Sequence, residues 1–101
     1  MKRKTFDEMK RRRLEAMNAG ERAAFDAVYD AARLAIEVGD QIRQARETAE
    51  MTQRQLARVM GTSQAAVARL EAGGTSATLT TLHKAAAALD LRVTVAFSPA
   101  D

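Results

Sequence analysis

The feature that most constrains the fold is a pair of short helical patterns in the middle of the chain, separated by Gly61. Thr52 and Gln55 have the Thr-x-x-Gln spacing of a capping box, which marks the start of a helix. Ser63 is a favourable N-cap for the second pattern, and Gly61 tolerates the left-handed backbone conformation of a tight turn. The pattern predicts a helix that begins after Thr52, a turn, and a second helix over residues 64–72.

Helical spacing continues on both sides of this pair. Residues 5–17 are expected to form one helix, and Asn18 is a favourable N-cap for another. Gly39-Asp40 is expected to kink that helix, or to restart it as the first helix of the core. Thr78 is expected to cap a last helix that closes the core. The predicted fold class is therefore all-α, apart from the end of the chain.

The end of the chain changes from helical spacing to strict alternation over residues 91–97, which predicts a β-strand. Its apolar face is formed by Leu91, Val93, Val95 and Phe97. A strand without a neighbour leaves a row of unpaired N–H and C=O groups. The same strand from a second subunit would pair with it by two-fold symmetry. The pattern therefore predicts a homodimer, and the alternative is a frayed tail.

Composition excludes several other classes of protein. The 101 residues suffice for one modest domain. The absence of cysteine excludes disulfides and thiolate metal sites, and it fits a cytoplasmic protein. The sequence has no apolar stretch of membrane-spanning length, no cluster with metal-ligand spacing and no glycine-rich phosphate loop. We therefore expect no membrane partner, no catalysis, no cofactor, no metal and no small-molecule substrate.

The charges of the chain are unevenly distributed, although the formal net charge is only +3. Residues 1–22 carry eight Lys or Arg and four acids, residues 23–50 carry three and six, and residues 51–101 carry five and three. Basic segments favour nucleic acid, whereas the acidic middle region is expected to bind a different partner. The alternative for the basic N-terminal arm is a solvated segment that binds no nucleic acid.

An apolar stripe runs along the helix expected after Asn18. Its residues recur at steps of three and four and are Phe25, Val28, Tyr29, Ala32 and Ile36. Such a stripe either packs against the chain's own domain or forms a docking face for a partner protein. We therefore expect residues 1–38 to be an N-terminal helical extension that docks a partner.

The second helix of the central pair carries residue types that read base edges in the DNA major groove. Its outward positions are expected to be Gln64, Ala65, Ala68 and Arg69. Glutamine bonds adenine, arginine bonds guanine, and alanine contacts the methyl group of thymine. Phosphate contacts are expected from the helix starts and nearby arginines, and the candidates are Gln53, Thr62, Ser63, Arg43, Arg54 and Arg58. For the three arginines, the alternative is that they are ordinary solvated charges on the helix surface.

These residues resemble the phage-repressor-like (XRE, Cro-type) helix-turn-helix family. The matching positions are Thr52-Gln53, Leu56-Ala57, Gly61, Ser63-Gln64, Val67, Leu70-Glu71 and Gly73. The resemblance implies a five-helix, lambda-repressor-like DNA-binding domain over residues 39–90. It also implies a buried structural ion pair between Arg46 and Glu71.

The C-terminal part of the chain is similar to antitoxins of the HipB and HigA types. The matching stretches are residues 78–82 and 88–95, and the helical extension before the core is similar to HigA-type antitoxins. In HipB-like members the terminal strand pairs across the dimer, which implies that residues 91–101 form a dimerisation strand and tail. The HigA likeness implies a RelE- or HigB-like toxin as the partner of the extension.

The sequence supports three functional hypotheses. The first is an antitoxin of a type II toxin–antitoxin system that neutralises its toxin and represses its own operon. The second is a stand-alone XRE-family transcription regulator without a toxin, and the third is an interaction adaptor whose helix-turn-helix no longer binds DNA. For the first two, the expected ligand is double-stranded DNA with an inverted-repeat operator.

Overall fold

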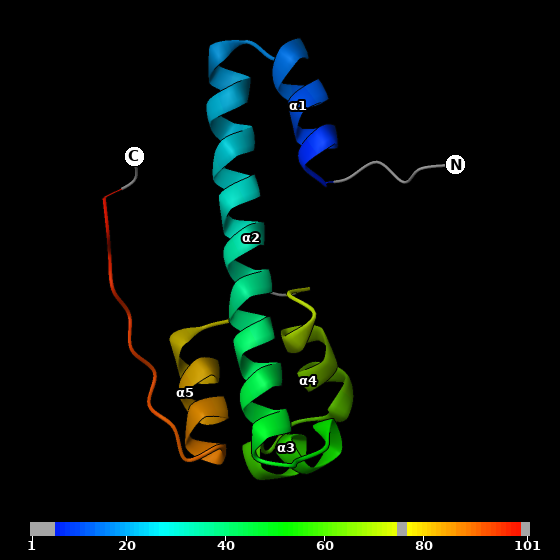
Figure 1. Cartoon of the computed structure of the whole chain (residues 1–101), viewed down its shortest axis with the longest axis vertical. Coiled ribbons are helices and arrows are strands. Elements are labelled where there is room, and N and C mark those ends of the chain that lie inside the picture. The colour runs from blue at the N-terminus through cyan, green and yellow to red at the C-terminus, as the bar shows by residue number, and fades with distance from the viewer. Residues whose placement is uncertain (1–5, 75–76, 100–101) are drawn as a thin grey trace. The chain divides into compact units, whose positions relative to one another are not determined.

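The computed structural model describes residues 6–74 and 77–99, in which the regular elements are all α-helices. They are α1 Phe6–Ala16, α2 Ala19–Thr48, α3 Gln53–Met60, α4 Gln64–Glu71 and α5 Leu79–Ala88 (Figure 1). The chain divides into two compact units, Met1–Ala32 and Arg33–Asp101. The start of the basic arm (residues 1–5) and the end of the tail (residues 100–101) lie outside the described residues. In the described part, no helix is long and apolar enough to cross a lipid bilayer.

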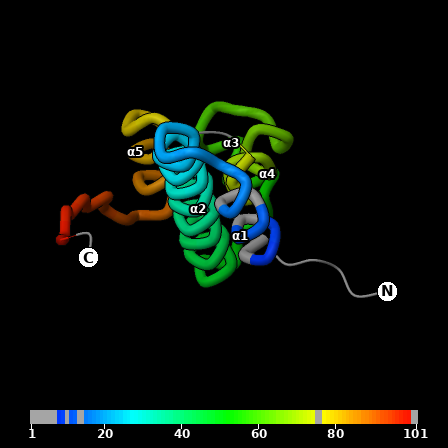
Figure 2. The backbone as a smooth tube through the Cα atoms, turned by 90° about the horizontal axis from the view of Figure 1, so that it is seen from above, coloured from blue at the N-terminus to red at the C-terminus, as the bar shows by residue number. Residues whose placement is uncertain are grey.

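The first unit contains α1 and the N-terminal turns of α2, which lie side by side (Figures 1 and 2). Asn18 caps α2 as predicted, because its Oδ1 accepts the backbone N–H of Glu21 at 2.8 Å. The rings of Phe25 and Tyr29 stack at a centroid distance of 6.4 Å, and Tyr29 is buried whereas Val28 is exposed. Tyr29 of the predicted apolar stripe is therefore packed within the chain, whereas Val28 remains exposed.

The second unit places α3, α4 and α5 around the C-terminal half of α2, with α4 and α5 on opposite sides of it (Figures 1 and 2). Its buried core consists of Ile42, Leu56, Ala57, Val67, Leu70 and Ala85. Leu56 and Val67 are fully buried, and they join α3 to α4 at the centre of the helix-turn-helix. Ala57 beside them is small, which allows the two short helices to pack closely.

Gly39 and Asp40 do not interrupt α2, which runs unbroken from Ala19 to Thr48. The prediction of a kink or restart is therefore wrong. The five-helix count of the domain is also not supported, because residues 39–90 contain only the end of α2 and three further helices. Gly39 serves close packing instead, since a Cβ atom there would lie 2.5 Å from the carbonyl oxygen of Leu70.

Gly73, two residues after the last residue of α4, makes the same kind of close approach to the backbone of α2. Its backbone φ is 75°, and a Cβ atom there would lie 2.8 Å from the Cα atom of Ile36. Two glycines thus allow the end of α4 to cross α2 with backbone against backbone. We call this crossing the α2–α4 contact.

The last four helices end in the same way, with one residue in the left-handed conformation. These residues are Glu50, Gly61, Gly73 and Asp90. In each case the next residue donates its N–H to the carbonyl five positions back, at distances of 2.7–3.1 Å, which is the Schellman motif. Gly61 was predicted at such a position. Glu50 and Asp90 were not, because a residue with a Cβ atom is strained there by about 1–2 kcal/mol.

The β-strand predicted over residues 91–97 is not present in the single chain. Residues 91–99 follow α5 as an irregular segment. Leu91, Val95 and Phe97 are exposed, Phe97 by 99 %, and Val93 is half-buried. A strand forms only against a neighbouring strand, and no described segment of this chain pairs with the tail. The pairing across a dimer is therefore not supported by the fold of one chain.

We expect Gly39→Ala to lower the free energy of unfolding by about 1–3 kcal/mol, because the added Cβ would overlap backbone atoms of α4 and force the two helices apart. Gly20→Ala on the same helix is the matched control, since its Cβ would meet only Asn18 Oδ1 at 3.6 Å. That variant should raise the free energy of unfolding by less than about 1 kcal/mol, because Gly20 lies in the first turn of α2, where helix propensity has a smaller effect than in the helix interior. Urea unfolding followed by circular dichroism measures both, and a gain in both variants would contradict the close contact.

Candidate nucleic-acid interface

The candidate interface is built by α3, the turn after it and α4. Thr52 closes the predicted capping box: its Oγ1 accepts the backbone N–H of Gln55 at 3.0 Å, and its own N–H donates to Gln55 Oε1 at 2.8 Å. Ser63 caps α4 by accepting the backbone N–H of Ala66 at 3.1 Å. Gly61 makes the turn with a φ of 72°. Local hydrogen bonds therefore determine where both helices begin.

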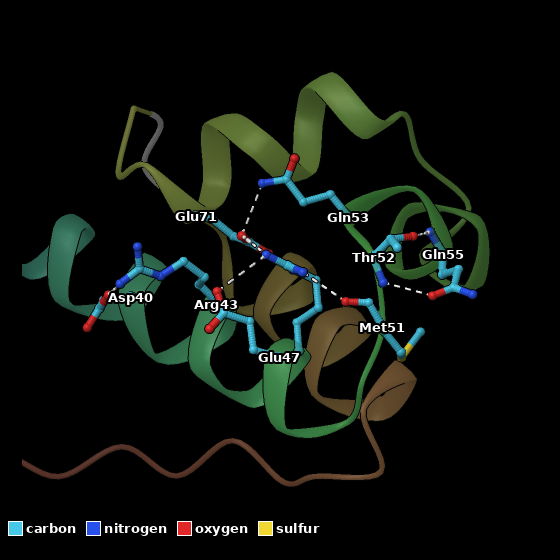
Figure 3. Close-up of polar contacts among 9 residues, drawn as sticks. Asp40, Arg43, Glu47, Met51, Thr52, Gln53, Gln55 and Glu71 are labelled. Carbon is cyan, nitrogen blue, oxygen red and sulfur yellow. Dashed lines mark hydrogen bonds and ion pairs between the residues drawn. The ribbon is translucent and has the colours of Figure 1, made fainter.

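An ion pair joins α2 to the end of α4 (Figure 3). Arg46 Nε donates to Glu71 Oε2 at 2.7 Å, and Arg46 Nη2 donates to Glu71 Oε1 at 3.0 Å. A third bond runs from Arg46 Nη1 to the carbonyl oxygen of Met51 at 2.8 Å. The two side chains are only 12 % and 4 % exposed. The pair that the family resemblance implied is therefore present.

Hydrogen bonding to Glu71 raises the pKa of Arg46 above its usual value, although desolvation by burial acts in the opposite direction. The guanidinium therefore keeps its charge in the interior. The carboxylate that balances it accepts two parallel N–H bonds, the geometry in which an arginine–carboxylate pair is strongest. None of the buried side-chain N or O atoms in the described residues lacks a hydrogen-bond partner.

Gln53, the first residue of α3, is connected to this ion pair. Its Nε2 donates to Glu71 Oε1 at 3.1 Å, and Figure 3 shows the amide nitrogen turned toward Glu71. The sequence placed Gln53 at a helix start for a phosphate contact, but it did not predict this bond. No local pattern could have done so, because the two residues are 18 positions apart.

Two open depressions border α4. The larger, of about 480 Å³, is lined by Arg46, Met51, Thr52, Gln53, Arg54 and Gln64. It brings the start of α3 and the start of α4 to one place. The smaller, of about 320 Å³, lies between α4 and the start of α5, and its lining includes Thr62, Arg69, Thr78, Thr81 and Lys84. Lys84 was not predicted here, although it lies three residues after Thr81 on α5.

The four residues predicted to face bases lie on one side of α4. Gln64, Ala65 and Arg69 are exposed, and Ala68 is half-buried. The opposite side of the helix is buried through Val67 and Leu70.

The residues predicted to contact phosphate have different surroundings. Gln53 and Arg54 line the larger depression, and Thr62 lines the smaller one. Ser63 and Arg58 are exposed. Arg43 lines neither depression, and its guanidinium on α2 is paired with Asp40. The structure therefore brings Gln53, Arg54 and Gln64 together, but not Arg43.

The linings of both depressions carry positive charge and contain no acid: Arg46 and Arg54 lie in the larger one, and Arg69 and Lys84 in the smaller one. Between Glu50 and Asp90 the sequence contains a single acid, Glu71, which is buried and paired with Arg46. The cations of the same span are all exposed, and they are Arg54, Arg58, Arg69 and Lys84. A positive surface of this kind attracts a polyanion. Among the described residues, no group of His, Cys, Asp or Glu side chains is placed to hold a metal ion.

We expect Arg46→Met to lower the free energy of unfolding by about 3–5 kcal/mol, because it leaves the Glu71 carboxylate buried without its counter-ion. Arg43→Met is the matched control, since it breaks an exposed pair with Asp40 on the same helix. Exposed pairs of this kind contribute less than about 1 kcal/mol. Thermal or urea unfolding measures both variants. Equal losses would mean that the buried pair has no special role in stability.

Residues 42–95, more than half of the chain, match the family described as Helix-turn-helix (HTH_3). No curated protein and no solved structure matches the chain significantly. The matched residues begin in α2, include α3, α4 and α5, and extend into the tail. They contain the ion pair, the turn and both depressions described above. The chain belongs to the XRE-type helix-turn-helix family of DNA-binding domains.

Proposed function

We propose that the protein is a sequence-specific DNA-binding transcription regulator that inserts α4 into the major groove. The positive linings of the two depressions that border α4 carry this proposal, because they contain Arg54, Arg69 and Lys84 and no acid. Neutralising phosphates with such residues supplies most of the affinity for DNA. The side chains of the inserted helix supply the sequence preference. Membership of the family supports the same role.

Gln64 and Arg69 are the proposed readers of base edges, since both are polar and exposed on α4. Ala65 offers a methyl contact to thymine. Ala68 is half-buried and therefore less available to a base. With two polar readers on the helix, part of the specificity would come from the shape and deformability of the DNA.

The larger depression is the proposed phosphate site. It lies at the start of α3, where the first N–H groups of a helix have no acceptor inside the helix and the helix dipole favours an anion. Gln53 and Arg54 line it, together with Gln64 from α4. One phosphate there would place α3 against the DNA backbone and α4 toward the groove.

We further propose that the DNA-bound form is a homodimer joined through residues 91–97. The exposure of Leu91, Val95 and Phe97 supports this proposal, because pairing of two tails would bury these side chains. A two-fold dimer predicts an inverted-repeat operator. The two half-sites would be centred roughly 34 Å apart, one turn of the double helix.

We expect Arg69→Ala to weaken binding to the operator by about 1–3 kcal/mol and to relax the preference at one base pair. Arg54→Ala should weaken all sequences alike and reduce the salt dependence by about one phosphate contact. Arg33→Ala is the matched control, because Arg33 is an exposed arginine of α2 paired with Glu37 at 3.3 Å. The operator is selected by the wild-type protein from random duplexes, and gel shift titrations at several salt concentrations give the affinities.

Affinity that does not change with salt would contradict binding through phosphates. A footprint that covers one half-site, or a monomer on the DNA, would contradict the homodimer. Loss of binding in Arg33→Ala as large as in Arg69→Ala would contradict the assignment of α4 as the reading helix.

The second candidate function is an antitoxin that also represses its own operon. The observation that favours it is the first unit, which lies outside the residues matched by the family and exposes Val28 by 69 % on α2. Asp30 is exposed in the same helix and suits a small basic partner such as a RelE- or HigB-like toxin. Of the other proposed docking residues, Tyr29 is buried and Ile36 belongs to the second unit. A stand-alone regulator fits the DNA-binding domain equally well.

If the protein is an antitoxin, co-expression with the product of an adjacent reading frame should give a stable complex on size-exclusion chromatography. Val28→Asp should then abolish this complex and leave DNA binding unchanged, because it places a charge in an apolar contact. Arg69→Ala should do the reverse. A protein that forms no complex while it binds its operator would be a stand-alone regulator.

A further inference from the structure

We infer that Glu71 is a positioning residue for the phosphate contact of Gln53, so that the buried ion pair also sets how tightly the protein holds DNA. The inference rests on the proposed function, because it takes Gln53 to be a phosphate contact. It adds a role to a carboxylate that family resemblance assigns to structure alone.

The geometry at Glu71 determines how the Gln53 amide is turned. Glu71 Oε1 accepts two bonds, one from Arg46 Nη2 at 3.0 Å and one from Gln53 Nε2 at 3.1 Å. An ionised carboxylate only accepts hydrogen bonds, so the amide nitrogen and not the amide oxygen must face it. Figure 3 shows this arrangement, with the amide oxygen of Gln53 turned away from Glu71.

This orientation leaves one donor of Gln53 for a ligand. An amide nitrogen carries two hydrogens. One is used by Glu71, and the second remains for an oxygen atom in the larger depression, which Gln53 lines together with Arg54 and Gln64. The side chain is already held before DNA arrives. Binding therefore loses less conformational freedom than it would with an unanchored glutamine.

The carboxylate anchors Gln53 without repelling the phosphate. A lone acid beside a phosphate would oppose binding, but both oxygens of Glu71 are bonded to Arg46. The Glu71 side chain is only 4 % exposed, so its charge is balanced within the protein. Arg46 itself lines the depression and adds positive charge to it. The nearby Glu47 carboxylate, 4.0 Å from Arg46 Nη2, is not part of that lining.

Two other glutamines of the helix-turn-helix serve as internal controls. Gln64 lines the same depression but has no bond to Glu71 among the described hydrogen bonds. Gln55 is held by its own capping box with Thr52. A change at Glu71 should therefore affect Gln53 and leave the other two unchanged.

The test is a double-mutant cycle on DNA affinity, in which Gln53→Ala is made in the wild type and in a background without the carboxylate. Glu71→Leu is the simple background. It leaves Arg46 with only the Met51 carbonyl oxygen and the more distant Glu47 carboxylate as partners. The second background is therefore Arg46→Met with Glu71→Leu, in which apolar side chains of similar size replace the pair, and we expect it to keep the fold. Circular dichroism establishes that each variant is folded at the temperature used.

The probes are the selected operator duplex and an unrelated duplex at low salt, because a phosphate contact acts on both. Gln53→Ala should weaken wild-type binding to each by about two- to tenfold more than it does in either background, the cost of ordering one free side chain. The matching cycle with Gln64→Ala should show equal effects in all backgrounds. Equal effects of Gln53→Ala in all backgrounds would overturn the inference.

A measurement on the DNA-free protein separates this inference from the proposed function. The side-chain amide signals of Gln53 in a ¹⁵N-labelled sample should shift and exchange faster with solvent when Glu71 is replaced, whereas those of Gln55 should not change. If the wild type binds no duplex, the proposed function falls and the inference falls with it. If it binds while the Gln53 signals ignore Glu71, only the inference is overturned.

Discussion

The end of α4 lies directly against α2, and the rest of the DNA-binding unit depends on this α2–α4 contact. The contact exists because Gly39 and Gly73 have no Cβ atom where the two backbones meet. Arg46 and Glu71 then join the same two helices by two hydrogen bonds. A backbone crossing and a charged pair side by side allow little rotation of α4. Its opposite side is therefore presented outward as a fixed surface.

The burial of one acid shapes the electrostatics of that surface. Glu71 is the sole carboxylate between Glu50 and Asp90, and an exposed acid at this place would oppose an approaching phosphate. Folding removes it from the surface by pairing it with Arg46. The same carboxylate holds the Gln53 amide, so one side chain takes part in the packing of α4, in the charge balance of the surface and in orienting the proposed phosphate contact.

The differences between the sequence analysis and the structure have identifiable physical causes. Glycine inside a helix is usually unfavourable, so Gly39 suggested a break, but its cost is offset by the close approach of α4. No prediction was made for Glu50 and Asp90, which adopt the left-handed conformation after their helices although they are not glycines. The alternating tail has the composition of a strand, but a strand requires a neighbour, and residues 6–74 and 77–99 of one chain supply none. For the apolar stripe the spacing left two alternatives open, and burial differs between neighbours: Tyr29 is packed within the chain while Val28 beside it is exposed.

The sequence by itself determined the features that depend on residues three or four positions apart. These are the caps at Asn18, Thr52, Ser63 and Thr78 and the turn at Gly61, because each is a hydrogen bond or backbone conformation within one turn of helix. Only the tertiary structure decided that Gly39 and Gly73 bring α2 and α4 together. It also decided that the Gln53 amide is held by Glu71. Those outcomes depend on atoms that are distant along the chain and adjacent only after the helices have packed.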